Sequence, residues 1–241
     1  SLFIIFNDKK VLFDLEEKTF IFDEAYLNFE NYDLEIIGIA EDDGKNIYAV
    51  DVTSTNFNYK EQGYKSLIDY DLRFILTSLS NNEINLIGRA NQLLHWIKSN
   101  KYCGYCGSAK KFNDEEQALF CDCNKIMIYP SISPCVLALI QKGNQILLAR
   151  NALFPEGLFS ALAGFIEVSE TAEETIEREI FEEVRLKVKN IKYFGSQSWP
   201  FPSQLMLAYT CEFDSGEIEV DGQEIVEAKW FDLNNLPNTP P

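Results

Sequence analysis

The chain contains 241 residues, 46% of them hydrophobic and 24% charged, and it carries a formal net charge of −17 at pH 7. This length suits one large or two ordinary domains, and the apolar content supports buried cores. Proteins that bind nucleic acid usually present a basic surface, so the acidity argues against a long phosphate backbone as partner. No apolar run approaches the roughly 20 residues that cross a bilayer, and the N-terminus lacks a secretory signal, so no membrane partner is predicted.

Histidine and cysteine usage narrows the chemistry further. The single histidine, His95, excludes a site with several histidine ligands and a histidine-dependent triad; we predict a packing or surface residue. Four of the six cysteines form two close pairs, which favours metal binding in a reducing compartment over disulfides. The predicted location is therefore the cytoplasm.

Residues 1 to about 70 are predicted to form a small, mainly β domain without a catalytic constellation. Turn signals at residues 8–9, 31–32 and 43–44 separate short apolar runs. The candidate strands are LFIIF, VLFDL, TFIFD, LEIIGIA and IYAVDV. We expect this part to serve packing or dimerisation.

Between residues 71 and 99 the apolar period becomes that of helices. A short helix is predicted around Leu72, and a second from near Asn82 to Lys98. Arg73 stands out as a cation in an acidic chain, although pairing with a nearby carboxylate would explain it equally well.

Two cysteine pairs follow, Cys103 with Cys106 and Cys121 with Cys123. Their spacing resembles a zinc ribbon, in which four thiolates surround the metal tetrahedrally and leave no open position, so the role would be structural. The alternative is four reduced, unligated thiols. Because side chains alternate along a strand, Cys123 joins the other three only if the chain turns at Asp122.

The rest of the chain predicts a mixed α/β domain. The runs PCVLALI and QILLAR form a hairpin around residues 142–144, and Cys135 and Cys211 are predicted to be buried, inert thiols. Further strands are LFSALAGFIEV, KNIKYFGSQSWPF, QLMLAYTCEF and IVEAKWFDL. The predicted fold class is α+β or α/β, with an α/β/α sandwich at the C-terminus. The predicted domains are a β-rich domain with linking helices (1–99), the zinc ribbon (100–130) and the sandwich (131–241).

The stretch from residue 164 to residue 186 is predicted to contain an amphipathic helix. Apolar residues recur at helical spacing over residues 172–184, and Ser169 or Thr171 supplies the N-cap. Gly164 is predicted to allow a sharp turn before this helix.

The same helix carries three carboxylates at i, i+3 and i+4, those of Glu179, Glu182 and Glu183, which places them on one face. Arg178 stands four residues before Glu182 and is predicted to brace it. Carboxylates this close repel one another unless a cation is present, and hard divalent cations prefer oxygen ligands. The alternative is a solvated acidic helix face.

The order of residues in this stretch resembles the Nudix box, the signature of Nudix hydrolases. The family usually has glycine at the position of Arg185, where it supplies a left-handed C-cap, so we expect a changed helix exit without loss of chemistry. The matching positions are Gly164, Glu170, Arg178, Glu179, Ile180, Glu182, Glu183 and Leu186.

A second informative stretch, SQSWPFPSQLM, covers residues 196–206. Its two prolines stiffen it, and Trp199 and Phe201 offer flat apolar surfaces to a base or nicotinamide ring. The alternative is a proline-rich connection between strands. The stretch resembles the SQPWPFPxS motif of the zinc-ribbon-containing NADH pyrophosphatase branch of the Nudix hydrolases, and departs from it at Ser198 and Gln204.

The resemblance implies a homodimer that hydrolyses NADH or NAD⁺ to nicotinamide mononucleotide and AMP, using Mg²⁺ or Mn²⁺ and a structural Zn²⁺. It implies Glu182 as the group nearest to general-base duty, with Glu224 second. The implied ligands of the divalent cations are the Ala163 carbonyl, Glu179, Glu182, Glu183 and Glu224. The candidate dinucleotide contacts are Arg73, Tyr129, Gln197, Ser198, Trp199, Pro200, Phe201, Pro202, Ser203 and Gln204.

Other functions stay open. Removal of an NAD cap from RNA breaks the same bond, although the acidity of the chain argues against tight RNA contact, and ADP-ribose or dinucleoside polyphosphates are further substrates. From another class, some Nudix-fold proteins bind nucleotides as regulators without hydrolysis. Those generally lose glutamates of the box, whereas this chain keeps them. The branch usually continues into a further helix after the position of Pro241.

Overall fold

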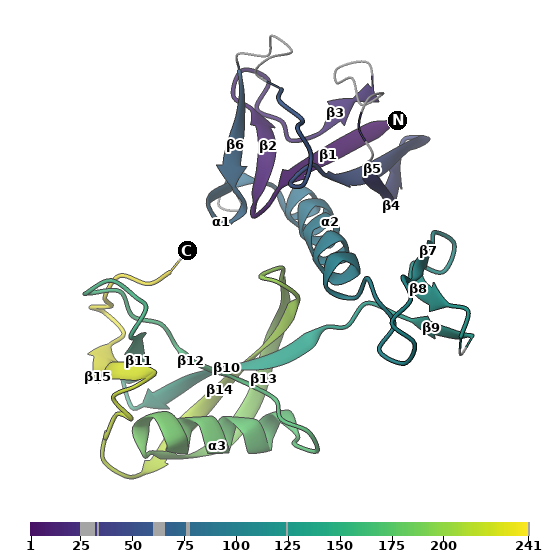
Figure 1. The fold of residues 1–241 in the computed structure, drawn as a ribbon. Helices are drawn as coiled ribbons and strands as arrows, with labels where there is room; N and C mark the ends of the chain where they lie inside the picture. Colours follow the sequence, from purple (N-terminus) through teal and green to yellow (C-terminus); the bar gives the residue numbers. More distant parts are fainter. Residues whose placement is uncertain (25–31, 33, 60–65, 76–77, 124, 241) are drawn as a thin grey trace. The chain divides into compact units, whose positions relative to one another are not determined.

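The computed structural model describes residues 1–24, 32, 34–59, 66–75, 78–123 and 125–240. Its contacts divide the chain into two compact units, residues 1–131 with 200–202, and residues 132–199 with 203–241. The predicted fold class is confirmed, because the N-terminal part is rich in strands and the C-terminal part mixes strands with a helix (Figure 1).

The first unit contains a six-stranded sheet in the order β4-β5-β1-β2-β6, with β3 paired to β1. Only the β1–β5 pair is parallel among the described pairs of this sheet. The strands are β1 (Leu2–Asn7), β2 (Lys10–Asp14), β3 (Phe22–Asp23), β4 (Glu35–Asp42), β5 (Lys45–Asp51) and β6 (Leu67–Asp71).

Five of these strands lie where the sequence predicts them. The predicted strand at 19–23 is shortened to β3, and β6 was not predicted because its two aspartates interrupt the apolar pattern. Of the turn predicted at residues 31–32, Asn31 lies outside the described residues.

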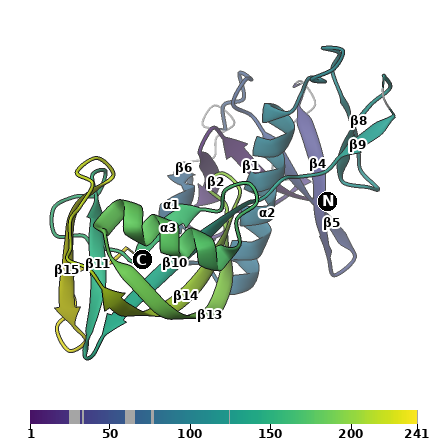
Figure 2. The ribbon, with the colours of Figure 1, turned by 90° about the horizontal axis from the view of Figure 1, so that it is seen from below.

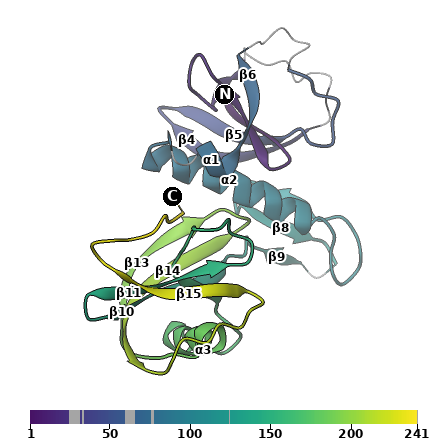
Figure 3. The ribbon, with the colours of Figure 1, turned by 90° about the vertical axis from the view of Figure 1, so that its left-hand side faces the viewer.

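Helices α1 (Leu72–Ile75) and α2 (Asn81–Ser99) follow the sheet. Ser80 begins α2 with a capping box, in which its side chain accepts the Glu83 backbone N–H and Glu83 bonds back to the Ser80 backbone. Ile4 and Phe6 of β1 share one hydrophobic cluster with α2, and alternate residues of β1 belong to a second cluster. Figures 1 and 3 show α2 along one face of this sheet.

A small antiparallel sheet completes the first unit. Its strands are β7 (Lys111–Asn113), β8 (Ala118–Cys121) and β9 (Ile126–Ile128), in that order. Leu119 of β8 is buried in the same cluster as Trp96 and Ile97 of α2, so this sheet has no separate core.

The second unit contains another six-stranded sheet, in the order β13-β14-β10-β11-β15 with β12 paired to β10. The predicted hairpin around residues 142–144 joins β10 to β11. The strands are β10 (Ser133–Lys142), β11 (Gln145–Asn151), β12 (Leu162–Phe165), β13 (Lys187–Trp199), β14 (Gln204–Ser215) and β15 (Ile225–Asp232).

Helix α3 (Ala172–Val184) lies across one face of this second sheet (Figure 2). Thr171 is its N-cap and forms a capping box with Glu174. Ile176, Ile180 and Val184 are buried against the strands, which leaves the acidic positions outside the apolar stripe. Over residues 132–240 it is the one helix described, so a second helical layer of the predicted sandwich is not among these residues.

The exit of α3 corrects one prediction. Arg185 itself adopts the left-handed conformation, with φ 61° and ψ 21°, and its N–H donates to the Phe181 carbonyl at 3.1 Å. The helix therefore ends as it would with glycine, and the predicted change of exit is wrong. The arginine adopts a backbone conformation that residues with a Cβ disfavour.

None of the helices in the described ranges combines the length and the apolar character that crossing a membrane requires.

Replacing Arg185 by glycine tests this strain. We expect Arg185→Gly to raise the free energy of unfolding of the second unit by about 1 kcal/mol, because glycine adopts positive φ without a steric penalty. Urea denaturation followed by circular dichroism measures it. Arg185→Ala is the control: it removes the side chain, which lies 5.3 Å from the Phe181 ring, but keeps the strain. Equal stability of both variants would contradict the explanation.

Candidate active site

The three predicted carboxylates of helix α3 differ in their exposure to solvent. Glu183 is buried, with 6% of its surface exposed, whereas the side chain of Glu182 is 58% exposed. The side chain of Glu179 lies between these extremes at 18%. Residues four apart share one helix face, so Glu179 and Glu183 point together toward the sheet side while Glu182 stays open to solvent.

Gly164 provides the space that Glu179 occupies. A Cβ at position 164 would overlap the side-chain carbons and a carboxylate oxygen of Glu179. Gly164 lies within β12, paired with Val136 of β10, so the sharp turn predicted there is wrong. Glycine is required because a strand and a carboxylate approach closely, and the sequence alone gives no sign of that approach.

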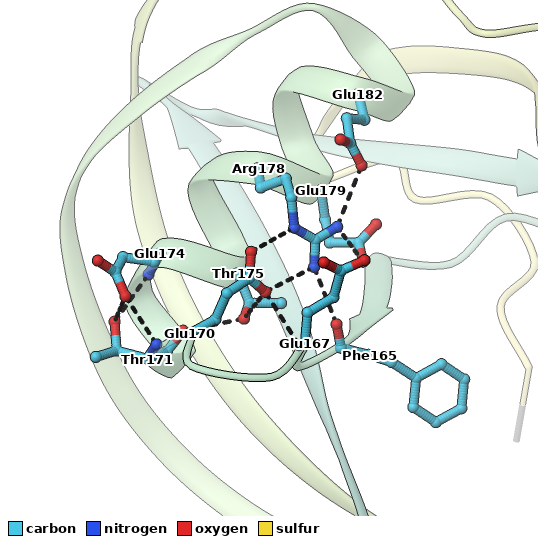
Figure 4. Close-up of polar contacts among 9 residues, drawn as sticks. All are labelled: Phe165, Glu167, Glu170, Thr171, Glu174, Thr175, Arg178, Glu179 and Glu182. Atoms are coloured by element: carbon cyan, nitrogen blue, oxygen red, sulfur yellow. Dashed lines mark hydrogen bonds and ion pairs between the residues drawn. The ribbon is translucent and has the colours of Figure 1, made fainter.

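Arg178 is the centre of an ion-pair network that joins α3 to the end of β12 (Figure 4). Its Nε lies 2.6 Å from Glu170 Oε1, and one Nη donates to the Phe165 carbonyl at 3.0 Å. The other Nη reaches Glu179 Oε1 at 2.9 Å and Glu182 Oε2 at 3.1 Å, so the predicted pairing with Glu182 is present. The guanidinium of Arg178 lowers the pKa of Glu170 to about 2. The sequence did not reveal Glu170 as the principal partner.

Glu183 is the one buried group of this region without a partner. In the described structure its Oε2 is buried and has no hydrogen bond. Burial raises its pKa to about 8, and the negative charges of Glu179 and Glu224 act in the same direction. Burial also raises the pKa of Glu179. A buried carboxylate of this kind either keeps its proton or binds a cation.

The loop before β15 carries two further acidic residues of this region, Asp221 and Glu224. Asp221 accepts the backbone N–H of Glu224 at 3.0 Å and that of Ile225 at 2.8 Å. The Glu224 carbonyl accepts the Ala152 N–H at 2.9 Å. Glu224 was predicted from the sequence, whereas Asp221 was not.

The donor types of these residues suit a hard divalent cation, although among the described residues only the four paired cysteines bring three or more potential ligand atoms within 4.8 Å of one another. The orphaned oxygen of Glu183 and the neighbouring carboxylates of Glu179 and Glu224 supply only oxygen donors, which Mg²⁺ and Mn²⁺ prefer. Ala163 precedes Gly164 in β12, the strand that packs against Glu179.

The four paired cysteines form a second cluster, in the first unit. Their sulfur atoms all lie within 4.8 Å of one another. The Cys103–Cys123 and Cys106–Cys121 pairs are each 3.6 Å apart, close to the roughly 3.8 Å edge of a tetrahedron around zinc. The chain turns at Asp122 directly after β8, which the sequence requires for Cys123 to join the cluster.

Hydrogen bonds favour the thiolate at Cys103 and Cys106, whereas the pKa values of Cys121 and Cys123 are raised beside the other thiols of the cluster. The Ser108 backbone N–H lowers the pKa of Cys106 to about 6, and backbone hydrogen bonds also lower the pKa of Cys103. The other two cysteines, Cys135 and Cys211, are buried as expected, and burial raises their pKa values to about 11 and about 12.

The predicted dinucleotide contacts fall into both units. In the first unit, Arg73 lies 5.0 Å from the centre of the Phe201 ring, and both line a cavity of about 760 Å³. Asn91 of α2 donates to the Pro200 carbonyl at 2.7 Å, and Pro202 lines the same cavity. Tyr129, also in the first unit, is exposed, and its hydroxyl donates to Glu116 at 3.1 Å.

The other predicted contacts belong to strands of the second unit. Gln197, Ser198 and Trp199 end β13, Gln204 begins β14, and Trp199 pairs with Gln204. Ser203 lies outside the strands, and its carbonyl accepts the Ser133 N–H at 2.9 Å. The rigid loop predicted over residues 196–206 is therefore mostly paired strand, with a turn only at residues 200–203.

Residues 131–241 match the family model described as the NUDIX domain. This part of the chain is a Nudix domain. The resemblance to Nudix hydrolases that the sequence predicts is thereby confirmed.

Curated relatives that match 64–65% of this chain carry the name NAD-capped RNA hydrolase NudC. The protein of Pseudomonas syringae pv. syringae (strain B728a) is 43% identical over 155 residues, which cover 64% of this chain and 56% of that protein. The protein of Escherichia coli (strain SMS-3-5 / SECEC) is 44% identical over 156 residues, covering 65% and 61%. The chain thus spans about three fifths of the length of these relatives. A solved NUDIX hydrolase from Nitrosomonas europaea matches at 24% identity with a TM-score of 0.49, over 56% of this chain and 80% of that one.

The raised pKa of Glu183 predicts how the stability of the cation-free Nudix domain depends on pH. The folded state keeps a proton that the unfolded chain loses near its ordinary pKa of 4.5, so this contribution is full below pH 4.5 and disappears as the pH rises through about 8. We expect the free energy of unfolding to fall by on the order of 2–4 kcal/mol across this window in EDTA.

Urea denaturation at several pH values measures this slope. Glu183→Gln should remove it, while Glu182→Gln, a change at an exposed position on the same helix, should keep it. An unchanged slope in Glu183→Gln would show that the buried carboxyl does not hold the proton.

The cysteine cluster predicts one zinc ion for each chain, released by a thiol-blocking reagent and measured with a chromogenic chelator. Cys121→Ser and Cys123→Ser should each lose it, because three thiolates bind zinc far more weakly than four. Cys135→Ala, in the Nudix domain, is the matched control and should keep full zinc content. Retention of zinc in Cys123→Ser would remove that residue from the ligand set.

Proposed function

We propose that the chain hydrolyses the pyrophosphate bond of a dinucleotide, NADH or NAD⁺, to nicotinamide mononucleotide and AMP. The observation that carries the proposal is the buried, unpartnered oxygen of Glu183 beside Glu179 and Glu224 in a Nudix domain. The relatives named for NAD-capped RNA support a substrate that contains NAD.

The proposed cation ligands are the Ala163 carbonyl, Glu179, Glu182, Glu183 and Glu224, and the cation is Mg²⁺ or Mn²⁺. When bound, such cations neutralise the pyrophosphate and lower the pKa of a bound water molecule. Because Gly164 leaves room for Glu179, the side chain reaches this position without displacing β12.

Glu182 is the proposed general base, with Glu224 as second candidate. Its side chain is the most exposed of the four box glutamates, which suits a group that meets water and substrate. Glu182 would take the proton of the attacking water as the oxygen–phosphorus bond forms and the bridging bond to the leaving phosphate breaks. Arg178 acts as a positioning residue, because it holds Glu182 and Glu179 at 3.1 and 2.9 Å.

The dinucleotide contacts proposed are Arg73, Tyr129 and the residues from Gln197 to Gln204. Phe201 and Arg73 already lie together, as an aromatic face and a cation suited to a nucleotide ring and phosphate. We further propose that the chain forms a homodimer and that the ribbon binds a structural zinc ion. The proposed domains are residues 1–99, 100–130 and 131–241. The cysteine cluster requires reduced thiols, which supports a cytoplasmic location.

Removal of the NAD cap from RNA is the second candidate, favoured by the names of the relatives. It breaks the same bond at the same carboxylates. The formal charge of −17 opposes tight binding of the RNA body, so this activity would depend strongly on ionic strength. ADP-ribose and dinucleoside polyphosphates share the pyrophosphate and are the remaining substrates to compare.

Turnover of a substrate panel with Mg²⁺ and with Mn²⁺, analysed by mass spectrometry, tests the proposal. We expect NADH or NAD⁺ to give nicotinamide mononucleotide and AMP. Glu179→Gln and Glu183→Gln should each lower kcat by roughly 10²–10⁴-fold, because the charge that holds the cation is lost. Glu177→Gln, an exposed position of the same helix, is the matched control and should retain full turnover.

Two outcomes would contradict the proposal. Near-wild-type turnover in both glutamate variants would refute the site, and hydrolysis of ADP-ribose alone would refute the substrate. Cleavage of NAD-capped RNA in preference to free NAD⁺ at each of several salt concentrations would make decapping the principal activity.

A further inference from the structure

Asp221 connects the backbones of two of the clustered glutamates. Its own N–H donates to the carbonyl of Glu183 at 3.2 Å. Its carboxylate accepts the N–H of Glu224 on Oδ2 at 3.0 Å and the N–H of Ile225 on Oδ1 at 2.8 Å. One residue therefore links the last turn of α3 to the segment that carries Glu224.

Further backbone hydrogen bonds hold the surrounding loop at the end of α3 and at Glu224. The Glu219 N–H donates to the Val184 carbonyl at 3.1 Å, so the loop satisfies carbonyls at the C-terminal end of α3 that have no partner within the helix. The Ala152 N–H donates to the Glu224 carbonyl at 2.9 Å. With Asp221 in place, hydrogen bonds hold the backbone of Glu224 at both its N–H and its carbonyl.

The electrostatics show why such fastening matters. Glu183 and Glu224 are both acidic and are linked through Asp221, so as carboxylates they repel one another. Glu224 is exposed and lies on a loop, so repulsion would move it outward if its backbone were free. Glu183 is fixed in the helix, and its Oε2 is buried without a partner. A cation that needs both groups would then have to draw the loop back at a cost in affinity.

We propose that Asp221 is a positioning residue that holds Glu224 beside Glu183 and so preorganises the cation site. The inference rests on the proposed function in one respect, the assignment of Glu224 and Glu183 as cation ligands. Asp221 acts through its hydrogen bonds to the loop backbone, not through contact with the cation or substrate.

Two substitutions separate this role from a role for the charge of Asp221. Asp221→Asn removes the negative charge but keeps one oxygen that accepts a backbone N–H, whereas Asp221→Ala removes both acceptors. A positioning residue predicts a small effect of asparagine and a large effect of alanine. A direct ligand, or a purely electrostatic role, predicts that both variants are equally impaired.

The experiment is a titration of the full chain with Mn²⁺, in which free Mn²⁺ is measured by electron paramagnetic resonance. Asp221→Ala should weaken Mn²⁺ binding by roughly 10–100-fold, and Asp221→Asn by less than about 5-fold. Asp232→Ala is the matched control, because the Asp232 carboxylate likewise accepts a backbone N–H, that of Asn234 at 2.9 Å. Asp232 ends β15, the strand that Ile225 begins, so its loss should leave Mn²⁺ binding unchanged.

A double substitution identifies the residue through which Asp221 acts. Glu224→Gln alone should weaken Mn²⁺ binding, and adding Asp221→Ala to it should cause little further loss, because the positioned carboxylate is already absent. Full additivity would overturn the inference, as would wild-type binding in Asp221→Ala or equal loss in Asp221→Asn and Asp221→Ala. Wild-type binding in Glu224→Gln would overturn both this inference and the proposed ligand set. Normal Mn²⁺ behaviour without dinucleotide hydrolysis would refute only the proposed substrate.

Discussion

Burial of the Glu183 carboxylate among other acidic groups is the constraint on which the arrangement of the second unit depends. An isolated buried carboxylate is costly as an anion, and here Glu179 and Glu224 add repulsion. The fold nevertheless keeps these groups together, with Gly164 opening space for one and Asp221 fastening the loop of another. Without a cation the cluster therefore favours the protonated form of Glu183, and with one the same burial strengthens the attraction.

Arg178 neutralises only some of these carboxylates. Its guanidinium is engaged by Glu170, by the Phe165 carbonyl and by Glu179 and Glu182, which leaves the inner oxygen of Glu183 without a partner. A solvated acidic face, the alternative that the sequence left open, would have exposed all its carboxylates.

The sequence predicted those features that depend on periodicity and spacing. Helix α3, the β10–β11 hairpin and the approach of four cysteines follow from patterns that chain geometry imposes locally. It failed where a distant element decides the conformation. The sequence predicts a turn at Gly164 because the approach of Glu179 is a tertiary contact that leaves no local pattern. It likewise predicts a changed helix exit at Arg185, whereas the folded chain keeps the left-handed one. Asp221 carries no motif, and its importance lies in hydrogen bonds that only the folded loop creates.

The two clusters of possible metal ligands differ in what they leave open. Four cysteine sulfurs at this spacing would surround a zinc ion completely, so such an ion could stabilise the fold but could not bind a substrate. The carboxylates come from one helix and one loop, and Glu182 stays exposed at the edge of the cluster. A cation that these carboxylates held from one side would retain positions for water and phosphate oxygens. Catalytic chemistry is therefore compatible with the second cluster and not with the first.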